Sequence, residues 1–439
     1  MSTPTHSIAV VIGASIAGLL AANALASHCE KVIILERDTL PDSPIQRNGV
    51  AQGSQVHILL QRGLIELEKQ VPGFTHLLTQ LGAVRLDPLN DFYLNFPFGV
   101  FVRTPTEMSV LSAERPVIEY ALRALILRRK NIQLVQQARV VKVDLSRAAV
   151  PRVTFSQADA AENNTLHPDW LIDASGRSSR VMEWLQQSEM PLPQEEHTKL
   201  SINYASCLIK NPTFPAQLKA SYILARAPHD RMSGLILPVH RDGTHLAALQ
   251  GFGTDMPSDF AGFRAAFQRL RDPLPGEALS TATAVDEVRR FNKPRNHFRH
   301  MGFTADWPLH FLTIGDSIAS INPIYGQGMT GAALAARVLG ERFGKTASGS
   351  LQRKITRQYR TLWEIASSED LRWPETTGKA KNLPVALGHL LGNKVVKAAT
   401  REKSVALAYA EVMHVLQPPT HLFKPHIALK WLFERLPRD

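Results

Sequence analysis

The segment GASIAG, at residues 13–18, has residue types that can bind the pyrophosphate of a dinucleotide. Such a ligand needs backbone N–H donors at the start of a helix. Gly13 permits the tight turn, Gly18 permits close packing of the helix on its strand, and Ser15 replaces the usual middle glycine with another small residue. Glu36 lies 23 positions after Gly13, where an acid accepts hydrogen bonds from an adenosine ribose. The predicted contacts of this unit are Gly13, Ser15, Ala17, Gly18, Glu36 and Arg37, and a turn without any ligand is the alternative.

A second segment, FLTIGDSIASINPIYGQGMTGAALAA at residues 311–336, carries an acid and then a glycine-rich helix start. Asp316 follows a buried-strand pattern, so its carboxylate can accept hydrogen bonds from the hydroxyl groups of a polyol. The glycines that open the alanine-rich helix offer backbone N–H groups to an electron-rich partner, such as the N1–C2=O edge of a flavin. The predicted contacts of this segment are Asp316, Pro323, Gly326, Gly328 and Met329, and Pro323 and Tyr325 shape its loop.

A third segment, LIDASGRSSR at residues 171–180, places an acid at a strand end, before a glycine and a pair of serines. These residues suit a turn next to a phosphate, with Asp173 as its acid. A plain surface turn is the alternative interpretation of this segment taken alone.

Hydrophobic patterning predicts the elements that position these segments. Residues 7–12 and 32–35 have the β-branched runs of buried strands, and residues 19–27 between them are typical of a helix, so the first segment lies in a β-turn-α-β unit. Further strands are expected at residues 88–102, 132–145, 170–172, 200–249 and 309–314, and further helices at residues 53–69, 115–129 and after 330.

Composition argues against several other classes of protein. Two cysteines, Cys29 and Cys207, make neither a disulfide framework nor a zinc cluster, and we predict no metal site. No apolar run reaches about 18 residues and the first run lacks the pattern of a signal peptide, so we predict a cytoplasmic protein. The formal net charge is +11, but RNA-binding and zinc-finger motifs are absent from the sequence, and we predict no nucleic-acid partner.

The positive charge gathers near the end of the chain, where residues 351–439 hold 15 Lys and Arg against 8 Asp and Glu. In the last part of this stretch, helical spacing puts apolar side chains on one face and charged side chains on another. The apolar face comprises Leu429, Leu432, Phe433 and Leu436, and the charged face comprises Lys430, Glu434 and Arg438. We favour a helix packed on its own protein, with peripheral membrane contact through this basic amphipathic segment as the alternative.

In this order and spacing, the three segments resemble those of the p-hydroxybenzoate-hydroxylase-type FAD-dependent monooxygenases. GASIAG resembles the family's FAD fingerprint, IGDS its GD motif and DASGRSSR its DG motif, over about residues 7–336. The resemblance implies that FAD is the cofactor and that Asp316 contacts its ribitol. The usual Asp-Gly of the DG motif is Asp173-Ala174 here, which leaves open whether NADPH or NADH reduces the flavin directly or through a separate flavin reductase.

Patterning and resemblance together predict an α/β fold, in detail an α+β two-domain flavoprotein. The expected parts are a Rossmann-like FAD-binding domain (residues 1–75, 110–182 and 290–345), an inserted, mainly antiparallel β-sheet domain for the substrate (76–109 and 183–289) and a helical C-terminal region (346–439).

A narrower resemblance is to the bacterial flavin-dependent epoxidases that act on polyenes, including polyether-type epoxidases, with squalene epoxidases more distant. It rests on RNGVAQGSQVHILLQRG at residues 47–63, AERPVIEYALR at residues 113–123 and NPIYGQGMT at residues 322–330.

This narrower resemblance implies roles for several polar residues. Arg47 and Arg115 would reach the ribose or pyrophosphate of FAD, and the backbone of Val140 would meet the adenine. His57 matches a histidine of these relatives; we favour a structural role for it, with contact to flavin or substrate as the alternative. The role of Gln55 is open.

The chemistry implied by the resemblance is reduction of FAD, capture of O2 and oxygen transfer from a flavin C4a-hydroperoxide to a small apolar, unsaturated substrate, most simply an epoxidation. Such a transfer needs a dry pocket and a well-held substrate but no protein nucleophile, so we assign no catalytic residue. The flavin-proximal candidates are His57, Pro323 and Tyr325.

Other functions stay open. An aromatic hydroxylase or a flavin-dependent halogenase would share the fold, although the Trp-x-Trp-x-Ile-Pro signature of tryptophan-type halogenases is absent from the sequence. A geranylgeranyl-reductase-like enzyme would reduce an alkene. A membrane- or carrier-docking flavoprotein without turnover is an alternative of another class.

The substrate pocket is expected between the flavin and the predicted antiparallel sheet. Its aromatic candidates are Phe92, Tyr93, Phe96, Tyr204 and Tyr222, and ordinary core packing of at least half of them is the alternative. Arg295, His297 and Arg299 could bind an acidic group, but we predict that they belong to a solvated surface.

Overall fold

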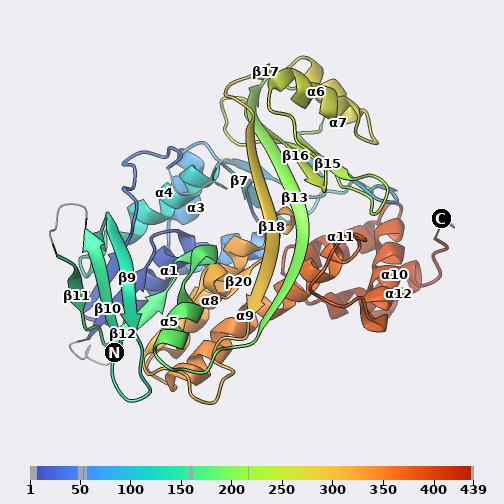
Figure 1. Ribbon diagram of the computed structural model, residues 1–439. Coiled ribbons are helices and arrows are strands. Elements are labelled where there is room, and N and C mark those ends of the chain that lie inside the picture. Colours follow the sequence, from blue (N-terminus) through green and yellow to red (C-terminus); the bar gives the residue numbers. More distant parts are fainter. Residues whose placement is uncertain (1–6, 48–52, 54–56, 158–161, 216, 437–439) are drawn as a thin grey trace.

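We describe the fold from a computed structural model, in residues 7–47, 53, 57–157, 162–215 and 217–436. Gln55 and residues 48–52 of the segment RNGVAQGSQ lie outside these described residues. Figure 1 shows a sheet with covering helices near the N-terminus, a second sheet built around two long curved strands, and a group of helices at the C-terminal end. The predicted α/β fold, with a parallel sheet, a mainly antiparallel sheet and a helical C-terminal region, is confirmed.

Five parallel strands form the first sheet. In spatial order they are β19 (Phe311–Thr313), β12 (Trp170–Asp173), β1 (Ile8–Ile12), β2 (Lys31–Leu35) and β8 (Ile132–Val135). Ile12 pairs with both Leu35 and Asp173, and Asp173 pairs with Thr313, so four of the strands end on one line. Ligands of open parallel sheets bind beyond the carboxyl ends of the strands, so this line is the place to look for a site.

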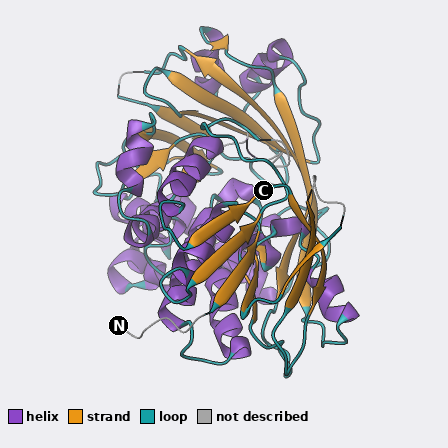
Figure 2. Cartoon of the chain, turned by 90° about the vertical axis from the view of Figure 1, so that its left-hand side faces the viewer, coloured by secondary structure: helices purple, strands orange, loops and turns teal. Residues whose placement is uncertain are grey.

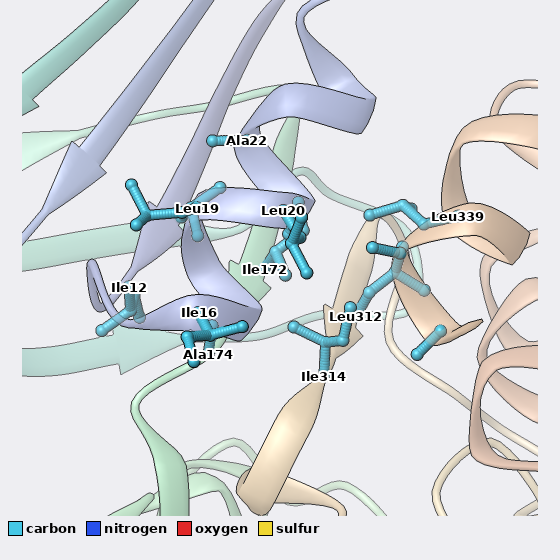
Figure 3. Packing of buried hydrophobic residues seen from close by; sticks show 14 of the residues in the cluster. Ile12, Ile16, Leu19, Leu20, Ala22, Ile172, Ala174, Leu312, Ile314 and Leu339 are labelled. Atoms are coloured by element: carbon cyan, nitrogen blue, oxygen red, sulfur yellow. The ribbon is translucent and has the colours of Figure 1, made fainter. Parts of the chain in front are cut away.

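Helix α1 (Ile16–Leu25) follows the first of these strand ends and packs on α8 (Gly328–Arg342). Figure 3 shows Leu20 of α1 beside Ile172 of β12, with Leu312 of β19 and Leu339 of α8 on the same side of the helix and Leu19 on the other. All of these side chains are buried in one cluster, and each buried leucine contributes about 1.5–3 kcal/mol. This core fixes the turns that open α1 and α8 relative to each other.

The second sheet has nine strands and is mainly antiparallel. Its order is β20 (Ala319–Ser320), β18 (Arg289–Arg299), β13 (Glu195–Lys210), β16 (Thr244–Phe252), β15 (Met232–Pro238), β14 (Ala220–Ile223), β5 (Phe92–Phe96) and β6 (Gly99–Val100), with β17 (Thr283–Ala284) beside β13. The long strands β13 and β18 run from helices α6 (Phe260–Gln268) and α7 (Leu274–Ser280) down to the parallel sheet (Figure 1). There β20, just after β19, pairs with β18, so the second sheet reaches the site edge of the first.

Figure 2 shows the strands of the two large sheets together with the helices beside them. Smaller elements surround the junction of the two sheets. They are α2 (Gln61–Gln70), α3 (Phe74–Gln80), α4 (Arg115–Ile126) and α5 (Val181–Gln187), a sheet of β3 (Ile58–Leu59), β7 (Val110–Ser112) and β4 (Val84–Leu86), and a sheet of β11 (Asn164–Leu166), β10 (Arg152–Gln157) and β9 (Ala138–Asp144). The helix predicted at residues 53–69 begins at Gln61, because Ile58 and Leu59 pair with β7 as a strand.

The C-terminal region contains helices α9 (Ser348–Asp370), α10 (Leu383–Ala398), α11 (Lys403–Met413) and α12 (Pro425–Trp431). Helix α9 packs along α8. The last three helices form one buried cluster with Phe101 and Met108, which lie close to the second sheet. Within the described residues, no helix has the length and apolar character needed to cross a membrane. The residue boundaries of the predicted domains stay a prediction.

Candidate flavin site

A cavity of about 710 Å3 lies beyond the carboxyl ends of the parallel strands. This volume is in the range of small-molecule and cofactor sites, roughly 300–1,000 Å3. All three segments singled out in the sequence contribute to its wall. The predicted residues in the wall are Gly13, Ser15, Ala17, Glu36, Arg37, Arg47, His57, Arg115, Val140, Asp316, Pro323, Gly326, Gly328 and Met329.

The three turns lie so close to one another that only glycine fits where they meet. Gly13 has a φ of +100°, and a Cβ there would lie 2.7 Å from the carbonyl oxygen of Ala174. Gly315 has a φ of +75°, and its Cβ would lie 2.7 Å from the Cβ of Ala17. Side chains cannot be accommodated at such distances, so these glycines hold together segments that are far apart in the chain.

Gly18 and Asp173 support the cavity from behind, and neither belongs to its described wall. Asp173 is fully buried, and its carboxylate accepts hydrogen bonds from the backbone N–H and hydroxyl of Ser175 and from the hydroxyl of Ser179. The predicted cofactor contact of Asp173 is therefore corrected to a positioning role. Its two oxygens shape the DASGRSSR turn because they are already satisfied within it.

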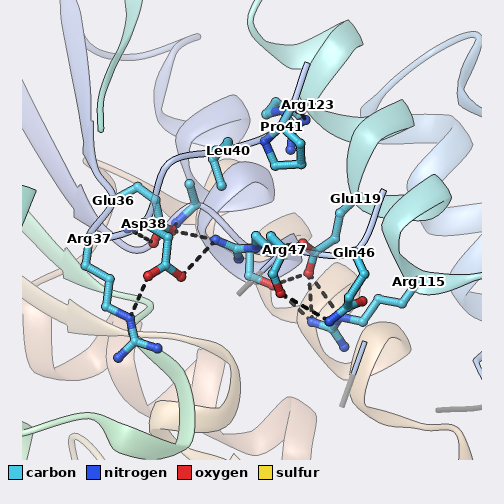
Figure 4. A network of polar contacts seen from close by, with 12 residues as sticks. Glu36, Arg37, Asp38, Leu40, Pro41, Gln46, Arg47, Arg115, Glu119 and Arg123 are labelled. Atoms are coloured by element: carbon cyan, nitrogen blue, oxygen red, sulfur yellow. Dashed lines mark hydrogen bonds and ion pairs between the residues drawn. The ribbon is translucent and has the colours of Figure 1, made fainter. Parts of the chain in front are cut away.

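Arg47 lies at the centre of a network of charges at one end of the cavity (Figure 4). Its guanidinium is 3.4 Å from Glu36, 3.5 Å from Asp38 and 3.5 Å from Glu119. The side chain is 8% exposed, and its Nε and one Nη have no hydrogen-bond partner among the described residues. The ion pairs hold this guanidinium in the wall of the cavity, where its positive charge suits the oxygens of a phosphate.

Arg115 orders the neighbouring part of the wall. It donates hydrogen bonds to the hydroxyl of Ser15 and to Glu119, each at 3.0 Å, and lies 3.3 Å from Nε2 of His57. Burial favours the neutral form of Glu119, but the guanidinium groups of Arg115 and Arg47 outweigh burial and lower the pKa of this carboxyl. Sequence analysis missed Glu119, although its spacing of four residues from Arg115 on one helix face was a usable signal.

The charge of the cavity wall favours an anionic ligand. Seven cationic side chains line it against three acidic ones, a surplus of four positive charges. The cations are Arg37, Arg47, Arg115, Arg139, Arg177, Arg180 and Lys293, and the acids are Glu36, Asp38 and Asp316. Because the pyrophosphate of a dinucleotide carries two negative charges, this field attracts it.

The GD segment and the turn after it form the other end of the cavity. Gly326 has a φ of +65°, which ends the short helical turn before α8. A Cβ at Gly328, the first residue of α8, would meet no described atom within 4 Å, so the start of this helix faces open space. Pro323 lines the cavity, whereas Tyr325 is outside its described wall and packs against the main core. This open cradle at one end and the cationic wall around Arg47 at the other fit FAD.

A buried polar network holds the turn that opens α8. The hydroxyl of Tyr204 donates to Oδ1 of Asn322 at 2.8 Å, and Nδ2 of Asn322 donates to Asp370 at 3.0 Å. Thr198 and Asn296 also donate to Asp370, but burial dominates and raises the pKa of its carboxyl to about 6. Tyr204, predicted for the substrate pocket, thus holds this turn. Asp370 was missed because it lies in a helix far from every motif.

The other predicted substrate aromatics occupy both faces of the second sheet, and none of the five belongs to the described wall of the cavity. Phe92 packs in a buried cluster on one face, and Phe96 of the same strand contacts Tyr222 and Tyr409 at ring distances of 6.4 and 5.7 Å. Tyr93 points to the opposite face, where its hydroxyl donates to an aspartate of the α6–α7 end. Tyr93 therefore does not lie with the other aromatic candidates for the substrate pocket, because successive side chains of a strand alternate between faces.

Of the three residues predicted to lie on a solvated surface, Arg295 is half exposed and pairs with Glu195 as expected, whereas the prediction is wrong for His297 and Arg299. His297 and Arg299 are buried, and Nε2 of His297 lies 3.1 Å from the carbonyl oxygen of Asp316. Arg299 donates to Glu195 and to the carbonyl oxygen of Ser317. Burial, with help from Arg299, lowers the pKa of His297 to about 4, so the ring is neutral beneath the GD segment.

Comparison with known proteins identifies the family. The FAD binding domain family matches residues 6–362. The chain is 31% identical over 344 residues to Protein Rv3254 of Mycobacterium tuberculosis, which covers 75% of this chain and 71% of that protein. It is 30% identical over 198 residues to the rifampicin monooxygenase of Streptomyces venezuelae, over 44% of this chain and 39% of that protein.

Among solved structures, that of the flavin-dependent brominase Bmp2 superposes with a TM-score of 0.65 and 12% identity, over 92% of this chain and 93% of the brominase. At this identity the likeness establishes the fold alone. The family match covers most of the chain and includes all three turns of the cavity. This chain therefore belongs to the FAD-binding-domain family of flavoprotein monooxygenases, and FAD is its cofactor.

Proposed function

We propose that this protein uses NADPH or NADH and O2 to insert one oxygen atom into a small apolar, unsaturated substrate, most simply as an epoxide. The observation that carries the proposal is the convergence of GASIAG, DASGRSSR and the GD segment with its NPIYGQGMT turn on one cavity. The likeness of residues 47–63, 113–123 and 322–330 to the polyene epoxidases favours an alkene over an aromatic ring.

The chain's own residues have distinct tasks along the cavity. Glu36, Arg47 and Arg115 would hold the adenosine and pyrophosphate end, and Asp316 would accept hydrogen bonds from the ribitol. The positive end of α8, opened at Gly328, would face the electron-rich edge of the flavin ring. Bound FAD would supply the reduction and the activation of O2.

Aromatic side chains fill the space between the second sheet and the C-terminal helices. Phe96 stacks on Phe101 at 4.5 Å between ring centroids, and both contact Tyr409 of α11. The C-terminal helices therefore cover an aromatic face of the second sheet. These rings pack against one another, so the choice of an apolar substrate rests on the likeness to the polyene epoxidases.

Isotope labelling tests the reaction. We expect that the purified protein, given NADPH or NADH, a polyene and 18O2, transfers one 18O atom into the product. A product that gains two hydrogens and no 18O would identify an alkene reductase, and turnover that depends on bromide or chloride would identify a halogenase. Flavin that binds but never turns over would favour the docking flavoprotein.

Anaerobic stopped-flow reduction by each nicotinamide, with and without a flavin reductase, identifies the electron donor.

We also propose that the C-terminal helices contact an anionic membrane surface. Helix α12 packs through Ile427 and Trp431, so the tail does pack on its own protein, but through a face other than the apolar face named from the sequence. The exposed apolar residues Leu383, Leu387 and Leu390 of α10 follow one stripe, and Leu429, Leu432 and Phe433 are exposed around the end of α12. Lys394 continues the stripe and donates to the carbonyl oxygen of Leu432 at 2.6 Å, which joins the two groups.

Vesicle flotation tests this contact with the full-length chain. We expect the protein to float with vesicles that contain anionic lipid and to stay down with neutral ones or at high salt. Leu429→Ser with Phe433→Ser should weaken flotation by more than tenfold, since each buried apolar side chain contributes about 1.5–3 kcal/mol. Leu192→Ser, at an exposed leucine elsewhere, is the matched control. Equal flotation of all variants would contradict the proposal.

A further inference from the structure

A buried lysine in the wall of the cavity is not explained by retention of the adenosine or ribitol. Lys293 lies on β18, is 6% exposed and lines the cavity together with Asp316, Ile321 and Pro323. It therefore sits at the end formed by the GD segment and the turn before α8. Sequence analysis missed Lys293 because the neighbouring Arg295 and Arg299 made the segment resemble a basic, solvent-exposed surface.

The contacts of Lys293 leave part of its ammonium group for a ligand. Nζ donates to the hydroxyl of Ser320 at 2.9 Å and to the carbonyl oxygen of Ile321 at 2.7 Å. An ammonium group has three N–H donors. No carboxylate of the described residues forms an ion pair with it, and the acids Asp316 and Asp370 act on it only from a greater distance.

Burying a charge in this way costs free energy unless the charge interacts with a partner of opposite sign. An ammonium group taken out of water loses several kilocalories per mole of solvation. Burial accordingly lowers the pKa of Lys293 to about 8, although Asp316 and Asp370 favour its charged form. A neutral side chain could donate to Ser320 and Ile321 without this cost. The positive charge itself therefore points to a negative partner in the cavity.

We propose that Lys293 contacts the ring end of bound FAD and stabilises the negative charge that the ring gains on reduction. Two electrons and one proton convert the oxidised flavin ring into its reduced anion, so one negative charge appears next to the cavity wall. A fixed cation in a water-poor site stabilises such a charge far more than it would in water. The inference rests on the proposed binding of FAD in this cavity.

Removal of the charge should make the flavin harder to reduce. We expect Lys293→Met to lower the two-electron midpoint potential, by about 30 mV for each tenfold loss in the stability of the reduced form. It should also raise the dissociation constant for sulfite, roughly tenfold or more. Sulfite donates a lone pair to the oxidised ring and leaves a negative charge on it, so it reports the same electrostatic field without any turnover.

A second substitution distinguishes the effect of the positive charge from the effect of the hydrogen bonds to Ser320 and Ile321. Lys293→Gln keeps a hydrogen-bond donor for Ser320 or Ile321 but carries no charge, so it should lower the potential as Lys293→Met does. Lys210→Met removes an exposed lysine from the neighbouring strand β13 and should leave the potential unchanged. Flavin content and the melting temperature of each variant establish that it is folded and loaded.

The unsubstituted protein provides a test that does not depend on the folding of any variant. A plot of midpoint potential against pH should steepen above about pH 8, by about 30 mV per pH unit, because Lys293 must then take up a proton when the flavin is reduced. The charged and titratable groups that act on Lys293 are Asp316, Arg177, Asp370 and His297, and the pKa values of Asp370, about 6, and His297, about 4, lie below this range.

Three results would overturn the inference. One is a wild-type potential in both neutral variants, and another is a wild-type potential in Lys293→Gln alone, which would mean that Lys293 only tethers the turn. The third is a potential without steepening between pH 8 and 10. A purified protein that takes up no FAD at all would instead contradict the proposed function, so the two failures are distinguishable.

Discussion

Asp316→Ala is expected to weaken the binding of FAD by about ten- to a hundredfold. A hydrogen bond that involves a charged group contributes about 1.5–3 kcal/mol, and each 1.4 kcal/mol changes a dissociation constant tenfold. Asp316 lines the cavity directly after β19, on a turn that Gly315 brings against Ala17. The measurement is a fluorescence titration of the FAD-free protein with FAD.

The matched control for this variant is Asp306→Ala. Asp306 lies shortly before the same strand, is half exposed and pairs on the surface with Arg147. Surface ion pairs of this kind contribute at most about 1 kcal/mol to stability, and neither partner of this pair belongs to the described cavity wall. Equal affinity for FAD in both variants would remove Asp316 from the ribitol site.

Gly18→Ala is expected to abolish the production of folded, FAD-containing protein. A Cβ at Gly18 would lie 1.9 Å from the carbonyl oxygen of Gly13, and that atom belongs to backbone that cannot move without opening the turn. Overpacking of this kind costs about 3 kcal/mol or more. It would also push α1 away from β1 and so displace the N–H groups at the start of α1 that would face the pyrophosphate of bound FAD.

Gly340→Ala provides the comparison within the same pair of helices. Gly340 lies inside α8, and a Cβ there would be 3.5 Å from the Cβ of Ala24 in α1, which is an ordinary contact. Alanine is favoured over glycine inside a helix by up to about 1 kcal/mol, so this variant should keep its flavin and melt no lower than the parent protein. Thermal melting and the ratio of flavin to protein absorbance distinguish the two. Normal flavin content in Gly18→Ala would contradict the role assigned to this turn.

Several parts of the flavin site could be predicted because they are set by residues close together in the chain. The turn at Gly13, the helix after it and the acid at Glu36 lie within one β-turn-α-β unit, and their spacing alone places them at a strand end. The turn at Gly326 and the start of α8 follow from local glycine geometry in the same way. These residues all line the cavity.

Other features depend on which strand face or neighbouring element surrounds a residue. Tyr93 was grouped with Phe92 and Phe96, but the pleat of β5 turns it to the other face of the sheet. The tail helix α12 packs through Ile427 and Trp431, because the rest of the C-terminal region meets that side. In each case apolar character was evident from the sequence, and the direction of burial was not.

The sequence by itself determined the cofactor class and the turns that receive it, because phosphate-binding turns and strand ends are built from residues a few positions apart. The tertiary structure decided which charges serve the cavity. Lys293 becomes a cavity residue only through the pairing of β18 with β20, and Asp370 supports Asn322 only because α9 returns beside that turn. Burial of a charge depends on atoms contributed by distant segments, so it is a property of the packed molecule and has no local signature.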